Sequence, residues 1–593
     1  MKRAQFSIQA GVLFMMLSLC ALFVSASAQP RRGSITGKIV TEDGAPMSGV
    51  TVMLGALTSN PTQRSLKTAV ADEEGNFQFA NLPPRTYSIS VMESRGYVQP
   101  PRPANTPQPV YRLGDNAIIR LTRGGVITGR VTYANGDPMI AVYVTAIRVR
   151  DAGGNPTRQQ TNSRSRLTDD RGVYRLYGLQ PGTYIVAANH SGASFYGLQS
   201  PFDGDAPTYY PSAPRDVAAE VNVTAGAETS GIDIRHRGDR GYVVSGKVIG
   251  GSESTGPMIF MANISLLGYP SGIFTGSSAV RLGEGENGFA FLGIPDGEYE
   301  LYADRGSADG DDSYRSEPRR VTVTGGDATG LELRLLPMAS IAGRVVIEPA
   351  PNACDPKAKS DPEEIALRPR REEKPADSPS MLRAFQTTFT ANETGEFKLN
   401  MLSPARYRIE LNPPNENWFV KSITGAGSTP AATPAKPSAA GAKPAGVTDL
   451  ARFGVALKPG ENLTGVTVAI ADGAVGLRGK VVAAKEGAKL PSRLRAHLIP
   501  WETTSADDAL RYGETLVASD GTFAFANFAP GKYRLLARAV PDSEPADRLP
   551  QPAAWDSAER AKLRKEAEAV KNEIELKACQ RVKDHLLQFE GNL

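Results

Sequence analysis

The residues with the most specific chemistry in this sequence are its four histidines, His190, His236, His497 and His585. No His-Glu-x-x-His, His-x-x-Glu or Cys-x-x-Cys spacing occurs, so the ligand pattern of a catalytic or structural zinc site is absent. The Gly-x-Ser-x-Gly motif, which presents a serine nucleophile ahead of a helix, is also missing. We therefore predict no catalytic residue, no metal site, no cofactor and no enzymatic activity.

A second set of candidates is aromatic. The segment 190–214 places Phe195, Tyr196, Tyr209 and Tyr210 among glycines and prolines. Exposed aromatic rings stack on sugars or anchor a protein partner, so these four residues are the candidate binding site. The alternative is that Tyr209 and Tyr210 only cover the edge of a sheet.

Cysteines are few. Outside the amino-terminal apolar run only Cys354 and Cys579 occur, 225 residues apart. They fall in different predicted domains and would pair only if those domains folded against each other. We expect two separate thiols.

The amino terminus has the pattern of an export signal. Lys2 and Arg3 precede an apolar run over 10–24, and small residues follow up to Ala28. The run is shorter than the roughly 20 residues that a membrane-spanning helix needs, so we predict a signal peptide over 1–28 that is cleaved after Ala28. A retained anchor is the alternative. No later apolar run is long enough to span a bilayer, so no transmembrane segment is expected in the mature chain.

Composition narrows the classes of partner. The 67 Lys and Arg residues nearly balance the 63 Asp and Glu residues, so no basic excess favours nucleic acid. Hydrophobic residues make up 40% and charged residues 22%, as in ordinary globular domains. The 59 glycines and 44 prolines indicate many short turns rather than long helices.

The elements that must position any site are five copies of one unit. Each copy begins with an alternating apolar strand around a glycine, at 35–39, 127–131, 244–248, 341–345 and 477–481. Each ends with an apolar residue, a proline turn and a tyrosine, at 82–87, 179–184, 294–299, 402–407 and 528–533. The first glycine and the last tyrosine are 50 to 64 residues apart in every copy.

Between these signals lies a polar turn that ends in glycine, followed by two large apolar residues at alternate positions. Such a turn is typical of a β-hairpin. Residues at i and i+2 of the strand that follows share one face of it. About seven strands in roughly 100 residues, each with one apolar face, predict an all-β chain of five tandem seven-stranded antiparallel β-sandwich domains. The tyrosine is expected to bond to nearby backbone, as in the tyrosine corner of immunoglobulin sandwiches.

The order Gly-x-Val, Asp-x-x-Gly-x-Phe-x-Phe, Leu-x-Pro-Gly-x-Tyr resembles the carboxypeptidase regulatory-like domain. That domain is a transthyretin-like, carbohydrate-binding-like sandwich, and it is also similar to the B-type repeats of collagen adhesins. The resemblance covers most of residues 33–541 and implies an accessory module without catalysis, found beside peptidases and in outer-membrane receptors. Two positions depart from the pattern, because Arg85 and Ala405 replace the glycine of the proline turn.

The expected domains are residues 33–123, 124–237, 240–336, 338–472 and 474–593, called units 1 to 5 below. Unit 4 carries polar insertions at about 350–380 and 425–446, which we predict to be disordered because they have few apolar residues to bury. One short helix is predicted over about 556–571, inserted before the last strand of unit 5. A single helix running to Phe589 is the alternative.

These features predict an exported, non-enzymatic binding or scaffold protein of the bacterial envelope, located in the periplasm, at the outer membrane or outside the cell. The alternatives are a carbohydrate-binding protein and an accessory component of a peptidase or outer-membrane receptor system. A polysaccharide or an envelope protein is the expected partner. The short linkers between the copies suggest a string of domains with restricted bending, and one such form is an extended envelope spacer.

Overall fold

The computed structural model describes residues 32–590 apart from 58–65, 95, 101–108, 158–163, 190–201, 203, 252–259, 269–272, 283–286, 307–312, 349–353, 356–359, 373–387, 426–447, 486–487 and 542–550. The predicted leader with its cleavage site at Ala28, the candidates Phe195 and Tyr196, and most of the two unit 4 insertions lie outside these residues. The prediction of disorder over 350–380 is wrong for residues 360–372, which form η4 (Pro362–Glu364) and β26 (Ala366–Arg371) because Ile365 and Leu367 are buried in the core of unit 4.

In the described parts of units 1 to 3, the regular elements are strands and one short 3₁₀ turn. Unit 1 contains β1 (Gly33–Thr41), β2 (Thr51–Ala56), β3 (Leu66–Val70), β4 (Asn76–Leu82), β5 (Tyr87–Glu93), β6 (Tyr97–Val98) and β7 (Asn116–Arg123). Unit 2 contains β8 (Gly125–Thr132), β9 (Tyr143–Asp151), β10 (Arg164–Leu167), β11 (Val173–Leu179), β12 (Gly182–Ala188), β13 (Thr208–Tyr209), η3 (Arg215–Val217), β14 (Val221–Val223), β15 (Glu228–Thr229) and β16 (Ile234–Arg235). Unit 3 contains β17 (Tyr242–Gly250), β18 (Phe260–Gly268), β19 (Ile273–Leu282), β20 (Gly288–Ile294), β21 (Gly297–Arg305), β22 (Tyr314–Ser316), β23 (Arg319–Val323) and β24 (Ala328–Pro337).

Units 4 and 5 add short helices to the same plan. Unit 4 contains β25 (Ala339–Glu348), η4 (Pro362–Glu364), β26 (Ala366–Arg371), β27 (Phe389–Thr390), β28 (Glu396–Leu402), β29 (Ala405–Asn412), β30 (Trp418–Gly425), β31 (Thr448–Asp449), α2 (Leu450–Phe453), β32 (Val455–Leu457) and β33 (Asn462–Asp472). Unit 5 contains β34 (Val475–Ala483), β35 (Leu494–Pro500), η6 (Thr503–Ser505), η7 (Ala509–Arg511), β36 (Gly513–Leu516), β37 (Thr522–Phe528), β38 (Gly531–Ala539), η8 (Ala553–Trp555), α3 (Ser557–Val570), β39 (Glu573–Leu576) and β40 (Arg581–Phe589).

Each unit encloses its own apolar core between two layers of strands. In unit 5 the layers are β37-β34-β40 and β36-β35-β38-β39, and in unit 1 they are β4-β1-β7-β6 and β3-β2-β5. In unit 3 the strand β22 pairs with β21 and with β24, so the two layers join into one sheet. The prediction of an all-β chain of tandem sandwiches is confirmed, although the residue bounds of the five domains stay a prediction.

Two details of the prediction differ. Among the described residues, units 2, 3 and 4 have nine, eight and nine strands rather than seven. The sheets are also mixed rather than purely antiparallel. The first strand of each unit lies between the strand that carries the alternating large apolar residues, which is antiparallel to it, and a strand near the unit's end, which is parallel to it. The two ends of a unit therefore meet in one sheet. A parallel pair needs a long crossover connection, and here the rest of the unit supplies it.

The recurring glycine of the first strand is explained by this parallel pair. A Cβ atom on Gly129 would lie 2.0 Å from the carbonyl oxygen of Ile232, and one on Gly343 would lie 2.0 Å from that of Val466. The same clash with the closing strand occurs at Gly37, Gly246 and Gly479. Glycine is needed here because two backbones approach closely, which is one of the reasons for glycine in a strand.

The recurring tyrosine forms the expected backbone bond in every unit. The hydroxyl of Tyr87 donates to the carbonyl oxygen of Pro83 at 2.8 Å, four residues earlier. The same bond is made by Tyr184, Tyr299, Tyr407 and Tyr533. These tyrosines are buried and fix the proline turn, so their role is structural.

The carboxyl-terminal helix is confirmed and the long-helix alternative is wrong. In α3 the side chain of Asp556 accepts the backbone N–H groups of Ala558 and Glu559, and the chain leaves the helix at Lys571 in a left-handed conformation. The strands β39 and β40 follow. Within the described residues, no helix has the length and apolar character needed to cross a membrane.

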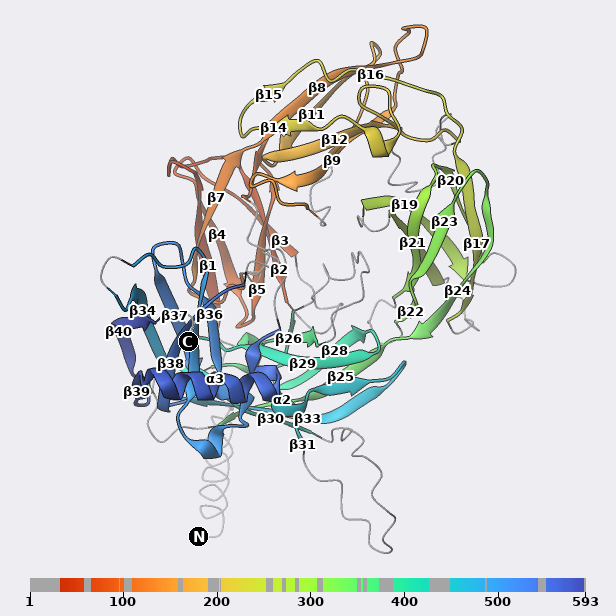
Figure 1. Ribbon diagram of the computed structural model, residues 1–593. Coiled ribbons are helices and arrows are strands. Elements are labelled where there is room, and N and C mark those ends of the chain that lie inside the picture. Colours follow the sequence, from red (N-terminus) through yellow and green to blue (C-terminus); the bar gives the residue numbers. More distant parts are fainter. Residues whose placement is uncertain are drawn as a thin grey trace, which may run out of the picture.

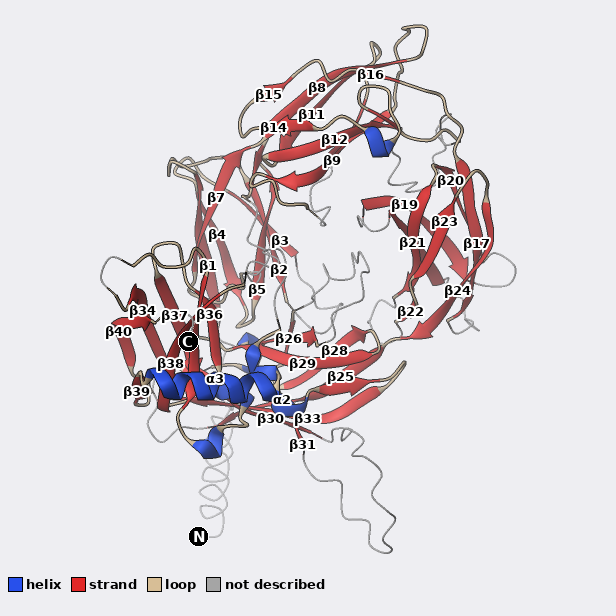
Figure 2. Ribbon diagram, viewed as in Figure 1, coloured by secondary structure: helices blue, strands red, loops and turns tan. Residues whose placement is uncertain are grey.

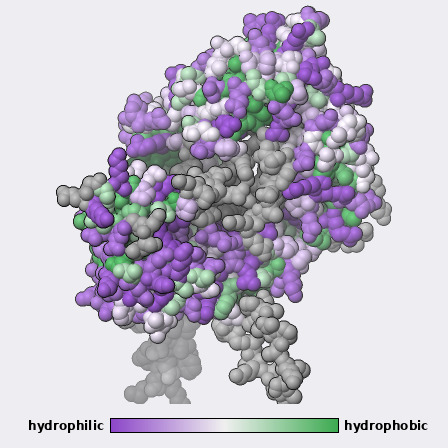
Figure 3. Space-filling view, viewed as in Figure 1, coloured by the Kyte–Doolittle hydropathy of each residue, from purple (hydrophilic) through white to green (hydrophobic). Residues whose placement is uncertain are grey.

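The units are not arranged as an extended string. Units 1 to 4 follow one another around a closed path, so that unit 4 returns to unit 1, and unit 5 lies against unit 4 (Figure 1). In the part of the chain that the structure describes, the helices are short, and α3 is the most prominent of them (Figure 2). The visible surface is mainly hydrophilic, with apolar residues in scattered patches (Figure 3).

Candidate functional site

The aromatic segment of unit 2 does not form an exposed binding platform. Tyr209 is only 3% exposed, and its strand β13 pairs with the edge of β12. Its ring packs with Ile147, Ile185 and Ala187 on the outer face of that sheet. The prediction that Tyr209 presents its ring to a ligand is therefore wrong, because the side chain is used to cover a sheet.

The other aromatic candidates give no free platform among the described residues. Tyr210 is half-buried and packs, with Phe202, against the core of unit 2. Phe195 and Tyr196 lie outside the described residues, so their roles stay predictions. The alternative given above, that Tyr209 and Tyr210 cover a sheet, describes what these two residues do.

His236 forms the arrangement that most resembles catalytic chemistry. Its Nε2 atom lies 3.2 Å from the Asp205 carboxylate, and its Nδ1 atom lies 3.3 Å from the Thr208 hydroxyl. A hydroxyl nucleophile must reach its substrate, yet Thr208 is 1% exposed and also accepts the backbone N–H of Arg237. The group therefore fastens the chain where unit 2 leads into unit 3.

The surroundings lower the pKa of two other histidines. Burial, together with the nearby Arg538 and Arg495, lowers the pKa of His497 to about 3. Burial also lowers the pKa of His585. His190 lies outside the described residues.

A residue that differs from the repeat makes a contact between unit 1 and unit 4. Nε of Arg85 donates to Oε1 of Glu363 at 2.9 Å, and both side chains are largely buried, at 23% and 15% exposure. The Thr86 hydroxyl lies 3.4 Å from the carbonyl oxygen of Glu363. Arg85 stands where units 2, 3 and 5 have glycine, so a departure noted in the sequence supplies this ion pair.

A second arginine extends the same contact. Nε of Arg112 donates to the carbonyl oxygen of Glu364 at 2.9 Å, and Nη2 donates to the Asn412 side-chain oxygen at 3.1 Å. The Thr390 hydroxyl donates to the carbonyl oxygen of Leu57 at 2.8 Å. Burial lowers the pKa of Arg112, and the neighbouring carboxylates oppose that shift.

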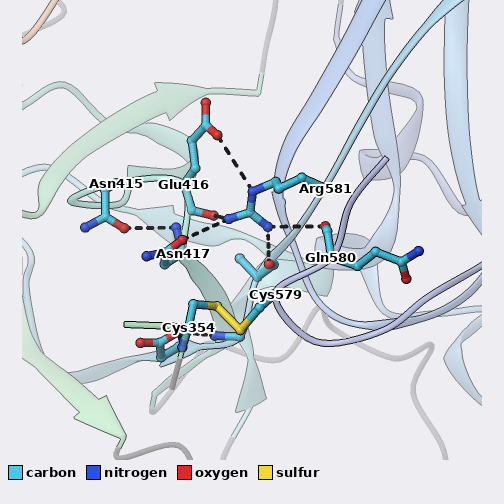
Figure 4. Close-up of a disulfide and its surroundings, with 10 residues drawn as sticks. Cys354, Asn415, Glu416, Asn417, Cys579, Gln580 and Arg581 are labelled. Atoms are coloured by element: carbon cyan, nitrogen blue, oxygen red, sulfur yellow. Dashed lines mark hydrogen bonds and ion pairs between the residues drawn. A yellow bond between two sulfur atoms is a disulfide. The ribbon is translucent and has the colours of Figure 1, made fainter. Parts of the chain in front are cut away.

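Unit 5 is fixed to unit 4 by a disulfide between Cys354 and Cys579, with Cα atoms 5.3 Å apart (Figure 4). The prediction of two separate thiols is wrong. Only Gly473 and Ala474 separate β33 from β34, so unit 5 folds back and brings the turn before β40 beside Cys354. The sequence spacing alone could not show this interface.

The disulfide lies in a polar network at the same junction. Arg581 donates to the backbone oxygens of Ala474 and Glu416 and to the side-chain oxygen of Asn417. Asp472 accepts the backbone N–H of Cys354 at 3.1 Å. These bonds saturate the linker between the units, so its backbone has little freedom to bend.

The two sulfur atoms and the Asp472 carboxylate lie within 4.8 Å of one another, a separation that suits a metal ion. Cysteine binds metals as the thiolate, and both sulfurs here are bonded to each other. The group is therefore a covalent link and not a ligand set.

An aromatic contact completes the interface between units 4 and 5. The guanidinium groups of Arg370 and Arg408 lie 4.7 and 5.7 Å from the centre of the Trp555 ring. Nε of Arg408 also donates to Glu372 at 2.6 Å, and the carbonyl oxygen of Glu372 accepts a bond from Gln551 of unit 5. Sequence reasoning missed these contacts, because no local pattern marks a residue that packs on another domain.

The comparisons with known proteins bear on unit 1. Residues 34–109 match the family model of the carboxypeptidase regulatory-like domain. The chain thus carries this domain at its amino-terminal end, as the motif order indicated. Among curated proteins, none is significantly similar to the sequence.

Several solved structures are similar in part. The minor pilin GBS52 of Streptococcus agalactiae is 16% identical, with a TM-score of 0.19 over 34% of this chain and 94% of that one. The major pilin subunit BcpA of Bacillus cereus is 11% identical, with a TM-score of 0.15 over 51% and 99%. The shaft pilin SpaA of Lactobacillus rhamnosus GG is 13% identical, with a TM-score of 0.16 over 35% and 97%.

Proposed function

We propose that the protein is an exported, non-enzymatic scaffold that binds other proteins of the bacterial envelope. The observation that carries the proposal is where its unusual residues lie. Residues shared by the five units form cores and turns, whereas Arg85, which departs from the pattern, forms a contact between units. His236 and His497 are buried and serve as structural groups. Such a chain offers surfaces for assembly.

Export and compartment are part of this proposal. The amino-terminal pattern supports removal of residues 1–28, and the disulfide agrees with an oxidising compartment. Amino-terminal sequencing of the mature protein is expected to begin at Gln29. Fractionation will then assign the periplasm, the outer membrane or the medium, and recovery of uncleaved chain in the cytoplasm would contradict export.

The binding role is tested by capture from the envelope. Full-length tagged protein, crosslinked in cells and purified under denaturing conditions, is expected to retain specific envelope proteins. The control is a tagged exported protein of similar size and charge. If the two samples retain the same proteins at the same level, the scaffold role is wrong. Retention of a peptidase or an outer-membrane receptor would support the narrower role of an accessory component.

The carbohydrate-binding alternative has less support, because Tyr209 is buried in the sheet it covers. It still makes a distinct prediction for Phe195 and Tyr196. A polysaccharide pull-down that is positive for the wild type and negative for Phe195→Ala with Tyr196→Ala would favour this alternative over the scaffold.

A further inference from the structure

The contact between units 1 and 4 has the chemistry of peptide recognition. Unit 4 presents the short turn η4 with the sequence Asp-Pro-Glu-Glu at 361–364, and unit 1 presents two arginines. We infer that the surface of unit 1 around Arg85 and Arg112 is a binding site for an acidic peptide turn, which the chain's own residues 361–364 occupy in the closed form. The inference deepens the proposed scaffold role by naming the class of partner.

The two arginines bind different groups of the turn. Arg85 bonds the carboxylate of Glu363, which demands an acidic side chain at that position. Arg112 bonds the backbone carbonyl of Glu364, which demands a particular path of the backbone rather than a side chain. A charged bond and a backbone bond together select an acidic residue in a defined turn.

The turn is held in the shape that the site requires. Pro362 begins η4, and the backbone N–H groups of Glu364 and Ile365 bond back to the carbonyls of Asp361 and Pro362. Ile365 is fully buried in the core of unit 4. The turn therefore meets unit 1 already ordered, which reduces the entropy lost on binding.

The site is present in unit 1, and the equivalent positions of the other four units do not form it. At the place of Arg85, units 2, 3 and 5 have Gly182, Gly297 and Gly531, and unit 4 has Ala405. None of these residues has a side chain that bonds a carboxylate. The site is thus a specific addition to one copy of a common fold.

The bound turn acts as an internal competitor. A partner that carries a similar acidic turn would have to displace residues 361–364, and displacement would separate unit 1 from unit 4. Because the main bond is ionic and part of the contact is exposed to solvent, added salt weakens it. The closed form is therefore a self-occupied state that an acidic partner opens.

Opening is measured on the full chain by energy transfer between dyes at Thr36→Cys in unit 1 and Ala456→Cys in unit 4, both exposed positions. We expect Glu363→Arg and Arg85→Gly to lower the transfer, and Arg85→Glu with Glu363→Arg to restore it. Arg85→Gly introduces the residue that other units have at this turn, so folding of unit 1 is preserved. Glu228→Arg, which breaks the exposed Arg175–Glu228 pair of unit 2, is the matched control and should change nothing.

Recognition is measured with a labelled peptide of residues 360–366, Ser-Asp-Pro-Glu-Glu-Ile-Ala. We expect it to bind the Glu363→Arg chain at least about tenfold more tightly than the wild type, whose site is occupied. Binding should be lost when Arg85→Gly is added, or when the peptide carries glutamine in place of Glu363. Equal binding to both chains, no binding to either, or a charge swap that fails to restore transfer would overturn the inference.

This outcome is separable from that of the envelope capture. A positive peptide assay with no captured protein would retain the site and reject the scaffold role. A negative peptide assay with specific captured proteins would reject the site and leave the scaffold role in place.

Discussion

Unit 4 contacts two neighbours, and the chemistry of the two contacts is different. Toward unit 5 it has a disulfide, a two-residue linker whose backbone is hydrogen-bonded and a tryptophan that packs on two arginines. Toward unit 1 the described residues form the Arg85–Glu363 ion pair and a few hydrogen bonds, between positions about 250 to 330 residues apart. One contact joins consecutive units and includes a covalent bond, and the other joins units that are not consecutive and is noncovalent.

The difference indicates which units of the closed path can separate from each other. Unit 5 cannot leave unit 4 without reduction of the Cys354–Cys579 bond. Unit 1 is held only by noncovalent bonds, whose strength depends on salt and on competing ligands. We therefore regard units 4 and 5 as permanently joined. The closed path of units opens at the contact between units 1 and 4.

Removal of the disulfide is expected to have the largest effect. Closing a loop of 225 residues restricts the unfolded chain, which the chain-entropy model converts to about 5 kcal/mol of stability. Cys354→Ser with Cys579→Ser should lower the free energy of unfolding of units 4 and 5 by about 3–5 kcal/mol in a denaturant titration. Wild-type protein under reductant is the matched control, and it should unfold like the variant. No shift in either sample would show that the disulfide does not stabilise this pair.

Acid is expected to have the next largest effect, and it acts on unit 5. The pKa of His497 is lowered to about 3 in the folded protein. Its contribution to the free energy of unfolding is therefore fully present above pH 6.5 and is lost as the pH falls toward 3. We expect unit 5 to lose up to about 1.4 kcal/mol per pH unit in this window, measured by denaturant unfolding. His497→Gln should remove this dependence.

Local patterns predicted the units well, because their signals lie within a few residues. The proline turn with its tyrosine and the alternating strands are short-range features, and the structure places them as expected. The parallel pairing of the first strand with a strand near the unit's end was missed, since it joins segments about 80 to 120 residues apart. Pattern alone does not set which strands become neighbours.

The candidate site was predicted poorly for a related reason. Tyr209 was read as exposed because it lies in a loop-rich segment, but both faces of the neighbouring sheet are covered and the ring is part of that cover. Arg85 was visible as a departure from the repeat, whereas its partner Glu363 lies 278 residues away. A single sequence shows which residue departs from the repeat, but it does not show which distant residue that side chain contacts.

A smaller effect is expected from one neutral bond between units 1 and 4. Thr390→Val keeps the shape of the side chain and removes the hydroxyl that donates to the Leu57 carbonyl. The loss should weaken the closed form by about 1 kcal/mol, seen as lower energy transfer at a given salt concentration. Combined with Arg85→Gly, it should have less effect than alone, because the contact is already open. Full additivity of the two changes would mean that they act at independent places.

The smallest effect is predicted at a departure from the repeat that builds no contact between units. The residue before the last position of β28 is Met401, with φ of 58° and 46% exposure, where the equivalent residues are Asn81, Gly178, Gly293 and Asn527. Asparagine and glycine adopt this left-handed conformation at lower cost than methionine.

Met401→Asn should therefore raise the free energy of unfolding of unit 4 by about 0.5–1 kcal/mol, measured by thermal or denaturant unfolding, and leave energy transfer to unit 1 unchanged. Arg85→Gly also restores a residue of the repeat, yet it should open the closed path of units. The pair of substitutions distinguishes a departure that serves assembly from one that only strains its strand, and a destabilising Met401→Asn would show that the methionine side chain has a role of its own.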